Sequence, residues 1–181
     1  MLLNDYLLHW DSALEGGVYE EKYAEYLSLN RTRFNRNYKT FKPSEAFLKA
    51  SHRISFPTHW IIITEPWCGD AAQSVPVLLR LIEQIPSASY SLTLRDQGSL
   101  IDQYLTNGGK GIPKVIVRDE QEIDLLVWGP RPQELTQLFH HAKDSGVEKE
   151  ALHVQLHTWY SQDKGLSVQQ EVSDALNLLN L

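Results

Sequence analysis

The feature that most constrains the fold is a short apolar strand that leads directly into a helix. Trp60 to Thr64 form a β-branched run, typical of a strand that is covered on both faces. From Gly69 to Ile85 the apolar residues recur at helical spacing. A second strand is expected from Tyr90 to Leu94, so the intervening helix predicts a crossover between two parallel strands.

The segment after this crossover predicts an antiparallel hairpin. A short helix is expected from Leu100 to Leu105, and the Asn107 to Gly109 turn ends it. Strands over residues 114–117 and 123–128 flank the polar residues Asp119 to Gln121. The order β-α-β-α-β-β-α therefore predicts an α/β fold built on a small mixed sheet.

Helical patterns flank this core on both sides. Before it, they cover residues 2–10, 18–36 and a segment that begins at Pro43; after it, they cover 132–143, 148–162 and 168–179. With 181 residues, 42% of them hydrophobic, the chain is expected to form one domain. We predict an N-terminal helical extension over 1–56, the core over 57–145, and a C-terminal helical extension over 146–181.

Composition excludes several classes of protein. Seventeen basic and 23 acidic residues give a net charge of −6, which argues against a nucleic-acid partner or an anionic membrane surface. No apolar run approaches the length of a membrane span, and the first residues lack the features of a signal peptide. Cys68 is the one cysteine, so an internal disulfide is impossible and a cytoplasmic location is expected.

Cys68 lies where the first strand ends and its helix begins, and here the chain resembles the thioredoxin superfamily. The turn of residues 67–71 resembles the family's active-site turn, and Pro76 stands where thioredoxins carry a helix proline. Ile112-Pro113 resembles the cis-proline loop, with Trp128-Gly129 after the hairpin. The resemblance is closer still to a poorly characterised bacterial thioredoxin group, and it implies a thioredoxin-like fold. The implied active-site turn comprises Trp67, Cys68, Gly69, Asp70 and Ala71, and the implied substrate-binding loop comprises Ile112 and Pro113.

Two positions depart from the family pattern. Ala71 stands where a second cysteine is expected, so a mixed disulfide at Cys68 must be resolved by an external thiol such as glutathione. Ile62 stands where thioredoxins place a buried aspartate, and Glu65 does not occupy that position. We therefore expect a thiol–disulfide oxidoreductase without a resolving cysteine, whose partners are glutathione or a protein bearing a thiol or disulfide. No metal or other cofactor is expected.

The helix N-terminus predicts a modestly activated Cys68 thiol. A helix N-terminus favours a thiolate, the charge of Asp70 disfavours it, and Lys110 or Lys114 is expected to restore the balance. The resemblance implies a cis bond before Pro113, which would turn the Ile112 backbone towards the cysteine.

Other interpretations remain open from sequence. The chain could be a redox-silent adaptor that uses the same groove, or a dithiol protein whose resolving cysteine was replaced at Ala71. A glutathione-dependent iron–sulfur carrier is disfavoured by Asp70 and Ala71, which differ from the monothiol glutaredoxin motif.

Three weaker features are interpreted as surface features. The basic and aromatic run from Arg31 to Lys42 is read as a solvated helix face. His153 and His157, four residues apart, are read as surface histidines and not as metal ligands. Arg131 is expected either to line the site or to cap the helix that follows it.

Overall fold

The computed structural model describes residues 1–179, which fold into seven α-helices, one 3-10 helix and a four-stranded sheet. No helix within this part of the chain is both long and apolar enough to cross a membrane. In chain order the elements are α1 (Leu3–Glu15), α2 (Glu21–Thr40), α3 (Glu45–Ser51), β1 (Thr58–Thr64), α4 (Gly69–Ile82), β2 (Ala88–Leu94), η1 (Leu100–Gln103), β3 (Lys114–Arg118), β4 (Asp124–Trp128), α5 (Gln133–Asp144), α6 (Lys149–Asp163) and α7 (Leu166–Leu179).

The sheet has the strand order β2-β1-β3-β4, and the predicted α/β fold is confirmed. Strand β1 pairs in parallel with β2, with Ile62 opposite Leu92, and α4 supplies the crossover between them. Strand β3 runs antiparallel to both β1 and β4. The predicted parallel pair and the predicted hairpin thus belong to one sheet, and Cys68 lies at the C-terminal end of its central strand β1.

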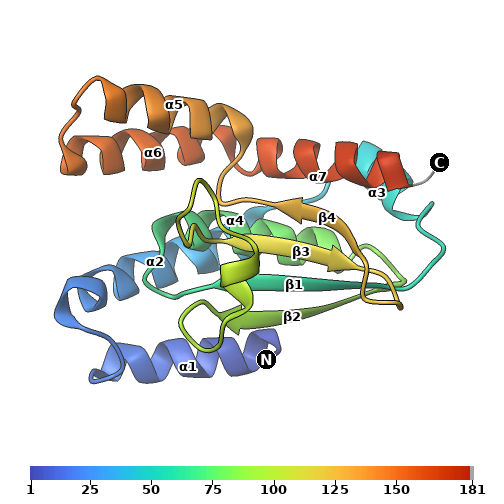
Figure 1. Cartoon of the computed structure of the whole chain (residues 1–181), viewed down its shortest axis with the longest axis horizontal. Coiled ribbons are helices and arrows are strands. Elements are labelled where there is room, and N and C mark those ends of the chain that lie inside the picture. The colour runs from blue at the N-terminus through green and yellow to red at the C-terminus, as the bar shows by residue number, and fades with distance from the viewer. Residues whose placement is uncertain (180–181) are drawn as a thin grey trace.

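Helices α2 and α4 lie behind the sheet in Figure 1, while α1 runs along the β2 edge. The backbone of Met1 exchanges two hydrogen bonds with Leu92, each 2.9 Å long, so residue 1 caps that edge. Helix α7 packs on β4, α4 and α3. The α5–α6 hairpin projects beyond β4 at the end of the molecule where β1 ends.

Two separate hydrophobic clusters hold these elements together. The larger one joins the sheet and α4 to residues of the flanking helices, including Trp10, Phe34, Phe47 and Val172, all at most 2% exposed. The smaller cluster lies within the α5–α6 hairpin, around Leu135 and Tyr160. Since the hairpin has an apolar centre of its own, its attachment to the rest of the chain depends on other contacts.

Several predicted boundaries are wrong, for local reasons. The helix expected over 18–36 runs from Glu21 to Thr40, and the helix expected from Pro43 starts at Glu45, because the Ser44 hydroxyl caps it by accepting a bond from Phe47 N. The helix expected over 100–105 is one 3-10 turn, since so short a segment does not nucleate an α-helix.

Strand β1 is also less covered than its sequence predicts. His59 and Ile61 on its front face are only half-buried, while Trp60 and Ile62 on the face towards α4 are fully buried. In Figure 1 the front face carries only η1 and its adjoining loops, which explains the difference.

Gly129, which follows β4, holds the hairpin against the loop of Pro113. Its φ of +105° lies in the region that favours glycine, and a Cβ at this position would collide with the backbone carbonyl of Pro113. The close approach of these two backbone segments therefore requires glycine.

We expect Gly129→Ala to lower the free energy of unfolding by more than about 3 kcal/mol, because positive φ and a backbone collision act together. Gly109→Ala is the matched control, since φ is not positive there and the nearest atom, Thr106 O, lies 3.5 Å from the added carbon. Urea unfolding of both variants measures the difference. Equal stability of the two variants would contradict this account of Gly129.

Candidate functional site

Cys68 is the N-cap residue of α4 and lies in contact with the proline loop. Its sulfur accepts a hydrogen bond from Ala71 N at 3.5 Å and donates one to Ile112 O at 3.3 Å. The peptide bond between Ile112 and Pro113 is cis. The structure thus brings together the five turn residues and the two loop residues that the sequence singled out, with the thiol between the helix end and the Ile112 carbonyl.

The environment of Cys68 keeps its thiol protonated. Burial raises the pKa of Cys68 to about 12, the nearby Asp70 charge adds to the increase, and the Ala71 amide and Arg131 offset it only in part. The expectation of a modestly activated thiol is therefore wrong, because desolvation outweighs the helix N-terminus.

The expected role of Lys110 and Lys114 is wrong as well. Lys110 forms an ion pair with Asp102 at 2.7 Å. Lys114 donates to Thr106 Oγ1 at 2.6 Å and to Gly129 O at 3.0 Å. The cation that acts on Cys68 is Arg131, which the sequence offered only as one of two readings.

Asp70 joins the active-site turn to the C-terminal hairpin. Its carboxylate accepts a hydrogen bond from Tyr160 at 3.0 Å and forms an ion pair with Arg131 at 2.6 Å. The Arg131 guanidinium also lies 4.2 Å from the centre of the Phe139 ring. One partly buried carboxylate therefore holds α6 and the segment before α5 against the start of α4.

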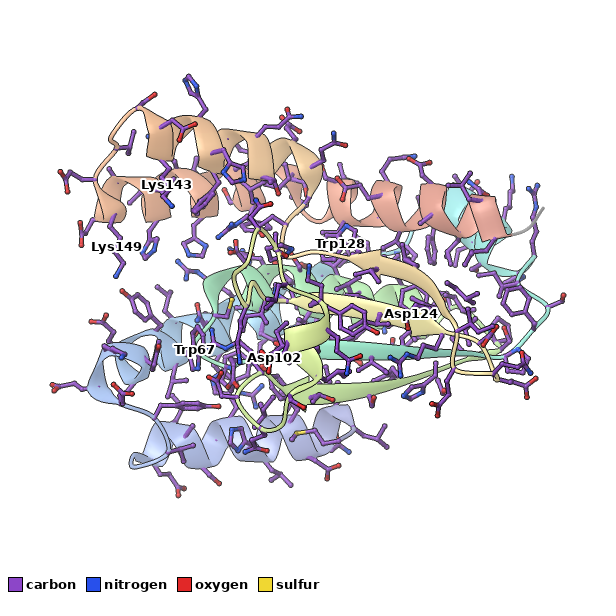
Figure 2. All side chains as sticks on the ribbon, viewed as in Figure 1. Trp67, Asp102, Asp124, Trp128, Lys143 and Lys149 are labelled. Atoms are coloured by element: carbon purple, nitrogen blue, oxygen red, sulfur yellow. The ribbon has the colours of Figure 1, made fainter. Side chains whose placement is uncertain are left out.

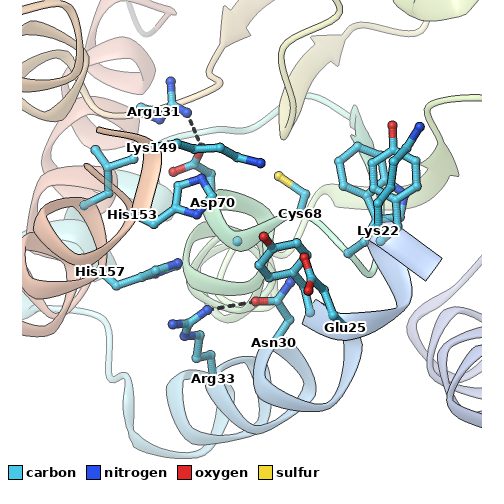
Figure 3. Close-up of a pocket in the computed structure, with 15 residues that line it drawn as sticks. Lys22, Glu25, Asn30, Arg33, Cys68, Asp70, Arg131, Lys149, His153 and His157 are labelled. Carbon is cyan, nitrogen blue, oxygen red and sulfur yellow. Dashed lines mark hydrogen bonds and ion pairs between the residues drawn. The ribbon is translucent and has the colours of Figure 1, made fainter. Parts of the chain in front are cut away.

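A cavity of about 430 Å³ opens beside Cys68, between α2 and α6. Figure 3 shows side chains from both helices pointing into it, with the Cys68 sulfur at its edge. In Figure 2, Lys149 at the start of α6 and Trp67 lie at the same end of the molecule, away from Asp124. We call this space the α2–α6 cavity; its lining comprises Lys22, Tyr23, Glu25, Tyr26, Asn30, Arg33, Trp67, Cys68, Gly69, Asp70, Arg131, Lys149, His153, Leu156 and His157.

One side of the cavity is aromatic. The rings of Tyr23 and Trp67 stack with their centres 4.5 Å apart, and Arg95 lies 4.6 Å above Trp67 from the outer side. Tyr26 meets the ring of His153 edge-on at 6.2 Å. His153 and His157 thus line the cavity instead of lying free on the surface. Within residues 1–179 no group of three or more His, Cys, Asp or Glu residues is arranged to hold a metal ion.

His157 is neutral, and its tautomer follows from a chain of amide contacts. Asn37 Nδ2 donates to the backbone carbonyl of Gln73 at 3.4 Å, which fixes the orientation of the Asn37 amide, and to Gln73 Oε1 at 2.7 Å. Gln73 Nε2 therefore faces His157 Nδ1, 3.3 Å away, as a donor. The imidazole proton is thus assigned to Nε2, beside Gly69, where a Cβ would lie 3.0 Å from that nitrogen.

Glu65 forms a second buried network next to the turn. Its carboxylate accepts bonds from the Tyr19 hydroxyl at 2.7 Å and from Asp96 N at 3.3 Å, and Tyr19 also bonds to His9 at 2.9 Å. Burial raises the pKa of Glu65. This network ties the turn to α1, and no spacing in the sequence indicated it.

These features define a thioredoxin-like protein with a single cysteine in the turn that joins β1 to α4. A family model described as thioredoxin matches residues 16–144, more than half of the chain. The chain therefore belongs to the thioredoxin family.

Two solved structures match it and show the same fold. A protein of unknown function from Pseudomonas aeruginosa is 16% identical with a TM-score of 0.61, over 86% of this chain and 89% of that one. An HIV epitope scaffold is also 16% identical, with a TM-score of 0.58, over 86% and 90% of the two chains. No curated protein matches the chain.

We expect Asp70→Asn to make Cys68 more reactive. The substitution removes a charge that raises the thiol pKa and releases the Arg131 charge, so the midpoint of the alkylation rate against pH should fall by about 1 pH unit. At neutral pH the rate should rise about tenfold. Asp102→Asn removes the same charge from the exposed pair with Lys110 and should leave the midpoint unchanged. An unmoved midpoint in Asp70→Asn would show that burial alone sets the pKa.

We expect His157→Gln to remove part of the acid sensitivity of the fold. Burial, with the charges of Arg33 and His153, lowers the pKa of His157 to about 4, below the unfolded value of about 6.5. As the pH falls, His157 therefore binds a proton in the unfolded chain before it does so in the folded one. The free energy of unfolding decreases as pH falls from about 6.5 towards 4.

The loss should be about 1–2 kcal/mol smaller in His157→Gln than in the unaltered chain, because the ring is half-buried and partly solvated. Urea unfolding at both ends of this pH range measures it. His140→Gln, which removes an exposed imidazole on α5, is the control. The same pH dependence in the His157 variant and the control would contradict the assignment.

Proposed function

We propose that this protein performs thiol–disulfide exchange through the single thiol of Cys68, with an external thiol as the resolving agent. The observation that carries the proposal is the position of the sulfur. It lies at the N-terminus of α4, beside the Ile112 carbonyl and at the edge of a cavity that a small molecule can enter. A cysteine with a purely structural role does not require an open cavity next to its sulfur.

The exchange takes place in two balanced steps. In the first, the Cys68 thiolate attacks one sulfur of a disulfide, a bond forms between the two sulfurs, and the other half leaves as a thiolate that takes up the proton lost by Cys68. In the second, an external thiolate attacks the substrate sulfur of the mixed disulfide and forms a new disulfide with it, while Cys68 leaves as a thiolate and takes up the proton that the external thiol lost. Glutathione or a protein thiol can fill the external role, and the electrons pass only between sulfur atoms, so the proposal requires no further cofactor.

Ala71 is the reason for the external thiol. It stands three residues after Cys68, where the family pattern has its second cysteine; it is 2% exposed, and its backbone N–H donates to the Cys68 sulfur. A methyl group there cannot attack the mixed disulfide. The intermediate should therefore persist until a second thiol enters from the cavity.

A redox-silent binding domain is the second candidate, and the raised pKa of Cys68 favours it. Because burial raises the pKa of Cys68 far above that of a free thiol, the thiolate is a minor species at neutral pH. Exchange at Cys68 must then be slow with any disulfide that the site does not bind. The two candidates differ in whether a mixed disulfide forms at all in the folded protein.

Incubation with oxidised glutathione should give one glutathione adduct on Cys68, visible by intact mass spectrometry. The adduct should persist until a thiol is added, and Cys68→Ser should form none. Ala71→Cys should release the adduct without added thiol and increase the reduction of insulin in the presence of a dithiol.

The unaltered chain unfolded in urea is the reference for this experiment. If the unfolded chain is fully modified while the folded chain stays unmodified over the same time, thiol–disulfide exchange is rejected. The redox-silent binding domain is then the better account. An adduct in both, with no release in Ala71→Cys, would mean that residue 71 does not occupy the resolving position.

A further inference from the structure

The α2–α6 cavity extends well beyond the thiol, and the exchange chemistry alone does not explain its outer part. Its outer walls are formed by Arg33 of α2 and by Lys149, His153 and His157 of α6. In Figure 3, the Lys149 side chain extends from α6 towards Cys68, while Arg33 rises from α2 on the side of His157. These side chains belong to helices outside the strand–turn–helix unit that carries the cysteine.

Two cations in this wall lack an acidic partner. Among residues 1–179, Arg33 bonds only to the Asn30 amide oxygen, at 3.0 Å, and neither Arg33 nor Lys149 forms an ion pair. By contrast, Lys22 pairs with Glu20, and Arg131 pairs with Asp70. Glu25 also lines the cavity, but the lining holds four basic residues against two acidic ones, and in a chain of net charge −6 this local excess favours a negatively charged ligand.

The third group in this wall is a neutral donor. The proton of His157 is assigned to Nε2, on the side of Gly69 and the cysteine turn, and the guanidinium of Arg33 lies close enough to affect the titration of this ring. A guanidinium, an ammonium and an imidazole N–H offer donors only. The ligand groups that match these donors are acceptors without protons of their own, and carboxylates have that chemistry. Lys149 and His157 lie eight residues apart on α6, about 12 Å along its axis, so a ligand with more than one carboxylate fits this wall.

We propose that the α2–α6 cavity binds the carboxylates of a small acidic thiol or disulfide and places its sulfur against Cys68. The proposal rests on the exchange function above and names the class of its small-molecule substrate. A volume of about 430 Å³ lies within the usual range for small-molecule sites. The stacked rings of Tyr23 and Trp67 form the apolar wall opposite, along which the carbon chain of such a ligand can lie.

Three disulfides with two methylene groups on each side of the sulfur atoms test this charge preference. Dithiodipropionate is anionic, bis(hydroxyethyl) disulfide is neutral and cystamine is cationic. The rate of adduct formation at Cys68 is measured for each by mass spectrometry and divided by the rate for the same chain unfolded in urea, which removes their intrinsic differences. The folded protein should prefer the anionic disulfide and disfavour the cationic one, and added salt should reduce the preference.

Charge-removing variants then locate the site. Arg33→Gln and Lys149→Gln should each lower the ratio of the dithiodipropionate rate to the neutral-disulfide rate about twofold to fivefold. Lys49→Gln removes an exposed charge on α3, outside the cavity, and should change neither rate.

The outcomes separate this inference from the exchange function. Equal normalised rates for all three disulfides overturn the acidic-ligand site and leave exchange standing, whereas no adduct with any disulfide overturns exchange. Cys68→Ser tests the site without chemistry: dithiodipropionate should shift the NMR ring signals of His157, and cystamine should not. Unshifted signals overturn the acidic-ligand site, whatever the exchange rates show.

Discussion

The arrangement of the site depends on the carboxylate of Asp70. It lies in the first turn of α4 and receives both Arg131 and Tyr160, which come from beyond the end of the sheet. The α5–α6 hairpin has its own apolar cluster, so polar contacts carry much of its attachment to the core. Without this carboxylate, Arg131 would be a partly buried cation without a partner, and α6 would lose a contact that holds it over the cysteine.

The same carboxylate opposes the chemistry expected of a thioredoxin turn. Thiol reactivity requires a thiolate. Asp70, two residues after Cys68, raises the pKa of the thiol while its carboxylate holds the hairpin in place. Burial beneath the Ile112 loop acts in the same direction. An acidic residue at position 70 therefore helps to hold α6 but makes Cys68 less acidic. In this chain the contact with α6 is kept and the thiol pKa is raised. In the exchange that we propose, selectivity would come from what the cavity binds and not from a freely reactive thiol.

Local patterns predicted the strand–turn–helix unit, the hairpin and the contact between Cys68 and the proline loop, because each depends on residues close in sequence or on a family motif. The walls of the cavity were not predictable in this way. Lys149 and His157 lie more than 80 residues beyond the cysteine, and only the packing of α6 on the core brings them there. The thiol pKa was mispredicted for the same reason, since helix position can be read from sequence but burial depends on the whole fold. The four-residue spacing did indicate that His153 and His157 share one face of a helix. It did not indicate that this face lines a cavity.

The exchange that we propose connects two features of the chain: Ala71 in place of a second cysteine, and the extra helices around the turn. A dithiol protein releases its substrate by an internal attack and needs no site for a second thiol. In the exchange that we propose, Ala71 makes release depend on an outside molecule that must reach the same sulfur, and binding of that molecule close to the sulfur would speed the step when the attacking thiol is dilute. Helices α2 and α6 supply walls at that place, with unpaired cations and a neutral donor facing inward. In this proposal the flanking helices give a single buried thiol the binding surface that its own turn does not provide.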